Sequence, residues 1–331
     1  MRSNGVKTGL SAGWLLVLVA AVAALAGVSL FVGVSDVSLQ ALLRPDEDSL
    51  ATRVLVISRV PRTLALVLVG ASMAVAGCIM QMLARNRFVE PSTAGTVESA
   101  GLGLLAVALL APGLPPFGKI AVASLFALGG TALFLAILRR VPLRSALLVP
   151  LIGLVLGGVI NAITTFFAYR FELLQSMHAW TTGDFSAVLR GRYEMLWLSA
   201  ALAVGAYVAA DRFTVAGLGE DFATNAGLNH RRLLTLGLVI VSVITAAAVV
   251  TAGVVPFIGL IVPNVVSLFM GDNLRRSLPW IAGLGAAFVL ACDLAGRLLL
   301  FPYEVPIGTV MGIVGSALFL VLLLRSRGRG A

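Results

Sequence analysis

The sequence predicts an all-α protein in which a single domain, residues 1–331, crosses a membrane ten times. Hydrophobic residues make up 59% of the chain and charged residues only 12%, whereas about a quarter of a soluble domain is charged. One soluble core cannot bury so much apolar surface, so lipid must cover the rest. Because lipid offers the backbone no hydrogen bonds, the spans are expected to be helices.

Ten apolar windows give the count, and most approach the ~20 residues that a helix needs to cross a bilayer. The windows cover residues 12–34, 63–84, 93–111, 117–138, 146–168, 194–210, 233–255, 258–270, 279–300 and 307–324. Window 258–270 is too short to span alone; it contains Pro263, and Pro256 lies just before it. We expect this window to form a half-helix packed inside the bundle.

Basic residues predict the orientation of the chain. With the amino terminus inside, most of the 24 Lys and Arg fall in inner segments, as is usual for cytoplasmic loops. Both termini are therefore expected in the cytoplasm. Ala24–Ala26 resembles a signal-peptidase site, but the apolar run continues to Val34, which favours an uncleaved first span.

The chain lacks the residue patterns of catalysis and metal binding. Its two cysteines, Cys78 and Cys292, lie in apolar windows, where they are expected to be buried hydrophobic residues. The sequence contains no phosphate-binding G-x-x-x-x-G-K-[ST] loop and no basic, aromatic-rich segment. We therefore expect no enzyme activity, no cofactor, no metal site and no nucleic-acid partner. If the protein works uphill, the energy must come from another subunit or from an ion gradient.

Two acidic residues lie inside the predicted spans. Asp293 precedes Arg297 by four residues, an acid-first spacing that favours a structural ion pair near the outer surface. Glu98 lies near the predicted cytoplasmic end of its window, where it is expected to reach the membrane interface. A buried acid is also a functional candidate by default, so a functional role for either residue stays open. The scarcity of such acids disfavours an ion-coupled secondary transporter.

Three arginines lie at predicted outer helix ends, against the usual distribution of basic residues: Arg59, Arg62 and Arg297. One interpretation is that they reach lipid phosphates. The other is that they form a basic platform for an acidic partner outside the cell.

Two further regions are candidates for function. Residues 211–232 form an inner loop with helical character and a break at Gly227, typical of a short helix that docks a cytoplasmic partner. Asn161, Thr164 and Thr165 are polar residues in the fifth window, and they are expected either to line a path or to bond to neighbouring helices.

Three segments carry a resemblance to a known family. Residues 59–95, 253–276 and 292–315 resemble, in order and spacing, signatures of the iron-siderophore and cobalamin importer permeases (FecCD/BtuC-like) of the ATP-binding-cassette (ABC) class. Many members have a histidine after the proline of the second signature, where this chain has Asn264. This version is more similar to permeases for ferric catecholate-type siderophores such as petrobactin or anguibactin.

The resemblance implies the type II ABC importer fold, with ten transmembrane helices in a bacterial inner membrane. It implies a second permease subunit in a heterodimer or homodimer, two cytoplasmic ATPases and an extracytoplasmic siderophore-binding protein. The expected function is import of ferric siderophores, with cobalamin or heme as the alternative cargo.

The resemblance also implies roles for particular residues. Arg59, Arg62 and Arg297 match the arginines that meet glutamates on the binding protein. Asn86 and Ser145 match inner gate regions. The contact with the ATPase is expected at Ala223, Thr224, Asn225, Ala226, Gly227 and Leu228.

Overall fold

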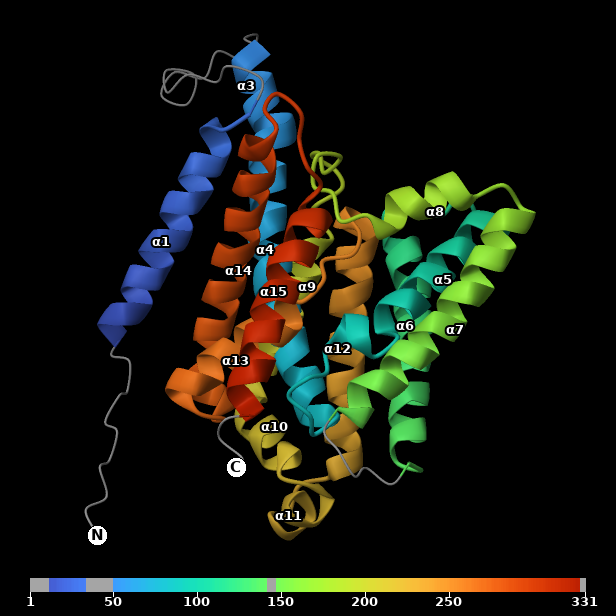
Figure 1. Ribbon diagram of the computed structural model, residues 1–331, viewed down its shortest axis with the longest axis vertical. Helices are drawn as coiled ribbons and strands as arrows, with labels where there is room; N and C mark the ends of the chain where they lie inside the picture. Colours follow the sequence, from blue (N-terminus) through green and yellow to red (C-terminus); the bar gives the residue numbers. More distant parts are fainter. Residues whose placement is uncertain (1–11, 34–49, 142–146, 328–331) are drawn as a thin grey trace.

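The computed structural model describes residues 12–33, 50–141 and 147–327, and Figure 1 shows them as a bundle of helices. The ten principal helices are α1 (Ala12–Phe31), α4 (Val60–Leu83), α5 (Thr96–Leu110), α6 (Pro116–Leu138), α7 (Leu148–Arg170), α9 (Leu196–Val208), α12 (His230–Ala252), α13 (Ile258–Met270), α14 (Leu274–Leu299) and α15 (Ile307–Arg327). The shorter elements are α3 (Leu50–Val54), a π-helix (Leu55–Arg59), a 3-10 helix (Pro91–Thr93), α8 (Leu174–Thr181), α10 (Ala210–Gly217) and α11 (Glu220–Asn225).

The observed helices confirm the predicted fold class. Seven are long and apolar enough to cross a membrane, and α9 with α10 forms a further candidate span that bends by 68°. α5 and α13 are shorter apolar helices. Each of the ten predicted windows coincides with one principal helix among the described residues. α13 is the predicted short helix, with 13 residues, an internal Pro263 and a buried first half.

Helix α4 forms the centre of the bundle, where it packs against α14, α13, α12 and α9. Glycines allow these helices to approach closely. A Cβ atom on Gly77 would lie 2.1 Å from the Cα of Gly259 on α13, and one on Gly70 would lie 2.7 Å from the carbonyl oxygen of Gly285 on α14. No side chain fits at such distances, so both crossings require glycine.

The flanks of the bundle are apolar but uncovered. Only 28% of the most apolar part of α7 and 22% of that of α15 are buried within this chain. Large side chains such as Leu154, Phe166 and Leu320 remain exposed. An apolar surface of this extent needs lipid or another protein to cover it.

Between α4 and α5 the chain folds back into the bundle before α5 begins. The buried carboxylate of Glu90 accepts a hydrogen bond from the backbone N–H of Phe257, at 2.9 Å, just before α13. The backbone of Thr93 passes so close to Gly153 on α7 that a Cβ there would clash with the Thr93 carbonyl oxygen. The α5 helix therefore starts in the interior, and its Glu98 lies beside Gly157, near the middle of α7. The expectation that Glu98 reaches the cytoplasmic interface was wrong.

Candidate functional site

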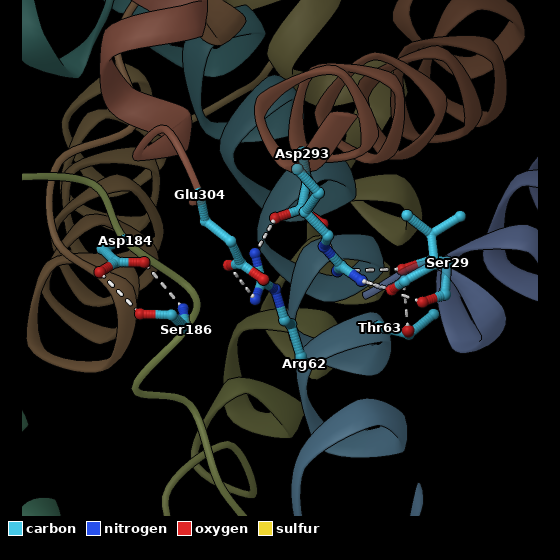
Figure 2. A network of polar contacts seen from close by, with 9 residues as sticks. Ser29, Arg62, Thr63, Asp184, Ser186, Asp293 and Glu304 are labelled. Carbon is cyan, nitrogen blue, oxygen red and sulfur yellow. Dashed lines mark hydrogen bonds and ion pairs between the residues drawn. The ribbon is translucent and has the colours of Figure 1, made fainter. Parts of the chain in front are cut away.

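Arg62, one of the three predicted outer arginines, lies with Asp293 and Glu304 in a cluster of charges (Figure 2). Arg62, near the start of α4, binds two acids at once. Its Nη2 lies 2.8 Å from Oδ1 of Asp293 on α14, and its Nη1 lies 2.7 Å from Oε2 of Glu304, in the turn before α15. Asp293 also pairs with Arg297, one helical turn along α14. The predicted Asp293–Arg297 ion pair is thus confirmed, as part of a larger network.

Two of the arginines also hold the end of α1 against the bundle. Arg297 donates from Nη1 to the carbonyl oxygens of Ser29 and Val32, both at 3.0 Å, and from Nη2 to the Ser29 hydroxyl at 3.2 Å. Arg59 donates from Nη1 to the carbonyl oxygen of Leu30, at 3.1 Å. The last carbonyls of a helix lack partners within the helix and carry partial negative charge, so guanidinium groups stabilise them.

Burial distinguishes the three arginines. Arg59 and Arg297 are only 7% and 4% exposed, whereas Arg62 connects the buried Asp293 to Glu304, whose side chain is 31% exposed. Buried charges are tolerated when each has an opposite partner, and this network supplies such partners. The structure therefore brings the three predicted residues together, but only the Arg62–Glu304 pair reaches the surface. Sequence reasoning missed Glu304, although its position inside the third signature was a usable signal.

The end of the bundle opposite the charge cluster carries the short helix α11, which projects beyond the ends of the spans (Figure 1). Ala223 is fully buried, and its carbonyl oxygen accepts from the N–H of Leu228 at 2.9 Å. Gly227 ends the helix with a φ of 74°, a conformation that glycine adopts without strain. Thr224, Asn225 and Ala226 are exposed on this turn. The exposed Phe222, which the sequence analysis did not select, adds an apolar side chain to the same surface.

Asn86, one of the two predicted gate residues, lies in the turn after α4 and lines a groove of about 370 Å³. Its side-chain oxygen accepts from the N–H of Phe88 at 2.8 Å, so the residue stabilises the turn. Asn264 donates to the carbonyl oxygen of Arg87, at 2.7 Å, and ties the same turn to α13. Ser145, the other predicted gate residue, lies outside the described residues.

Two of the three predicted path residues share one cavity. Asn161 and Thr164 on α7 line a space of about 420 Å³ between α5, α7, α8 and α12. Thr164 is buried and donates to the carbonyl oxygen of Ile160, at 2.8 Å, whereas Asn161 is exposed. Thr165 is exposed and does not line this cavity. Glu98 and Trp180 complete its polar and aromatic wall.

No resident metal site is visible in the part of the chain that the structure describes. Among those residues, no three His, Cys, Asp or Glu side chains are grouped so that they could hold an ion.

Comparison with known proteins agrees with this architecture. The profile of the FecCD transport family matches residues 12–325. The petrobactin import system permease protein YclN of Bacillus subtilis is 48% identical over 303 residues, which cover 92% of this chain and 95% of that protein. The ferric-anguibactin transport system permease protein FatD of Vibrio anguillarum is 40% identical over 301 residues, covering 91% and 95%.

A solved structure extends the similarity to three dimensions. It is an inward-facing conformation of a metal-chelate type ABC transporter, with a TM-score of 0.78 and 26% identity over 95% of this chain and 99% of that one. The match covers the whole helical bundle, so the similarity is not confined to the three sequence signatures.

Proposed function

Because the chain belongs to the FecCD transport family, we propose that it is the membrane permease through which an ATP-driven importer moves ferric siderophores into the cell. The observation that carries the proposal is the 48% identity, along nearly the whole chain, to a petrobactin import permease. The cargo class is thus a ferric chelate of the catecholate type. ATP hydrolysis belongs to a separate subunit, in keeping with the absence of a phosphate-binding loop in the sequence.

The permease works as a pair. The uncovered apolar flanks of α7 and α15 support a second permease subunit, identical or related, with the cargo path between the two. Asn161 lies exposed on that flank, and Thr165 provides a second polar side chain there. Thr164 is buried against the neighbouring helices, so it contributes to the path only as part of the wall of the cavity beside Glu98.

An extracytoplasmic binding protein docks on the outer charge cluster. Arg62 is the arginine that an acidic partner meets first, because its ion pair with Glu304 is the exposed edge of the cluster. Arg59 and Arg297 are buried beneath the end of α1, so they bind a partner only when α1 moves aside. Opposite charges on the binding protein compete with Glu304 for Arg62, which makes docking selective for an acidic surface.

The ATPase docks at the opposite end, on residues Ala223–Leu228. Exposed apolar and polar side chains on one projecting helix are typical of a surface that a partner covers. ATP-driven movement of α11 is transmitted to α12, which follows it directly, and to the turn that contains Asn86. With the ATPase on the cytoplasmic side, the proposal includes both termini in the cytoplasm and the arginine cluster outside, across a bacterial inner membrane.

The experiment is uptake of ferric siderophores by cells that carry or lack this gene. Labelled iron should accumulate with ferric catecholate chelates only when the gene and its partner subunits are present. An ionophore that collapses the proton gradient, added while cellular ATP is maintained, should leave uptake unchanged. Uptake that stops with the ionophore would instead indicate an ion-coupled transporter.

A further inference from the structure

The half-buried acid Glu98 has no role in the fold that its surroundings explain. It lies in the first turn of α5, and its carboxyl carbon would be 3.2 Å from a Cβ placed on Gly157 of α7. Its Oε2 atom is shielded from solvent and has no hydrogen-bond partner among the described residues. An ionised carboxylate without a partner is costly at this depth, so such residues in membrane spans commonly mark a ligand or ion.

The cavity beside Glu98 is large enough for part of a ligand and carries no positive charge of its own. Its volume is about 420 Å³, and none of its lining residues among the described ones is Lys, Arg or His. Glycines 101, 157 and 158 leave the space beside the carboxylate open. The exposed Gly158 and Asn161 form its opening on the flank of α7, the side on which the cargo path is proposed.

The other groups in the wall narrow the chemistry of the ligand. Trp180, on α8, supplies an aromatic ring. The Thr181 hydroxyl donates to the carbonyl oxygens of Met177 and His178, and its lone pairs can still accept hydrogen bonds from a ligand. The remaining wall is mostly aliphatic. A metal cation needs several oxygen ligands around it, and the wall provides a single carboxylate. One carboxylate, an aromatic ring and an apolar surround are instead the groups that recognise an organic ammonium ion.

We propose that Glu98, with Trp180, Asn161 and Thr181, forms a subsite that accepts an ammonium group carried by the cargo as it passes through the permease. The inference rests on the proposed function, because it makes Glu98 part of the import path. Because an ionised carboxylate without a partner is costly in this cavity, the proposal includes a protonated Glu98 in the empty site. When the ammonium group enters, the proton leaves to solvent, and the carboxylate and the ammonium form an ion pair. The site thereby favours chelates with a free amine over otherwise equal chelates without one.

The first test measures uptake by the complete importer in proteoliposomes of phosphatidylglycerol, a lipid without an ammonium group. The probes are a ferric tris-catecholate with one primary amine and the same chelate with that amine acetylated. Glu98→Gln should lower the ratio of amine-chelate uptake to acetylated-chelate uptake at least about tenfold. Glu98→Asp, which keeps the charge, should restore part of the preference. The matched control is Glu172→Gln, an exposed acid just beyond the end of α7.

The second test follows the carboxyl group directly by infrared difference spectroscopy on the complete importer. The C=O band of protonated Glu98 should be present in the unmodified protein and absent from Glu98→Gln. In the unmodified protein the amine chelate should deplete this band, and the acetylated chelate should leave it unchanged. A band that neither chelate changes, or that both deplete equally, overturns the subsite. Absence of any uptake by the unmodified importer contradicts the proposed function instead, and the infrared result still decides whether the ammonium subsite exists.

Discussion

Replacing Arg297 by methionine tests whether the buried charge cluster holds its end of the bundle together. The substitution keeps an unbranched apolar stem and removes the guanidinium, which makes an ion pair with Asp293 and three hydrogen bonds to Ser29 and Val32. Removing one partner of a buried ion pair costs about 3–5 kcal/mol. Hydrogen bonds in membrane proteins add about 0.6 kcal/mol each. Asp293 keeps its pair with Arg62, so the ion-pair cost should lie near the lower end, at about 3 kcal/mol, and the three hydrogen bonds raise the total loss to about 5 kcal/mol.

The assay is reversible unfolding of the purified permease in mixed micelles, followed by circular dichroism. The control is Arg275→Met, because the Arg275–Asp211 pair is exposed on both sides, at 51% and 63%, and such pairs contribute about 0–1 kcal/mol. Arg297→Met should therefore lower the free energy of unfolding clearly more than Arg275→Met. Equal losses for the two variants would refute the reasoning that burial gives this cluster its stabilising effect.

Three more predictions concern docking, coupling and helix packing. Arg59→Glu combined with Arg62→Glu should weaken binding of the extracytoplasmic protein at least about tenfold in a pull-down titration. The control is Arg170→Glu, at the exposed end of α7, which should leave binding unchanged. Unchanged binding by the double variant would remove the docking role. Gly227→Pro should lower transport per ATP hydrolysed, because proline cannot adopt the φ of 74° that ends α11, and a normal ratio would place the coupling element elsewhere. Gly77→Ala should reduce the yield of folded protein far more than Gly129→Ala. A Cβ at Gly77 meets the backbone of α13, whereas a Cβ at Gly129 meets nothing within 4 Å. Similar yields would mean that α4 and α13 separate without cost.

Sequence reasoning predicted those features that depend on local composition or spacing. The ten spans follow from runs of apolar residues, and the short α13 follows from the length of its window and its prolines. The Asp293–Arg297 pair follows from helical periodicity, because residues four apart lie on the same face. The end of α11 at Gly227 follows from the conformational freedom of glycine.

Features that depend on long-range packing escaped prediction. Arg62 and Glu304 are 242 positions apart, and their pairing requires the turn before α15 to lie over the start of α4. The depth of Glu98 was misjudged because the segment before α5 folds back into the bundle, held by Glu90 at the start of α13. Hydropathy gives the position of a span along the chain, but it does not show that a connecting segment re-enters the interior.

The same limit affected the outer arginines. The sequence indicated that Arg59, Arg62 and Arg297 share one end of the molecule, and the structure agrees. It did not indicate that α1 covers two of them, because that contact depends on how α1 packs against α14 and α4. Their burial changes the order of events that we propose for docking, in which Arg62 meets the partner before the other two.

The most direct measurement is transport in proteoliposomes that contain the purified permease and its partner subunits. A labelled ferric catecholate siderophore and its binding protein are supplied on the side of the Arg62–Glu304 cluster. The account predicts accumulation of iron on the opposite side only when ATP is present on the side of α11, and none with a non-hydrolysable ATP analogue. Equal accumulation without ATP, or transport that follows an imposed ion gradient, would contradict it.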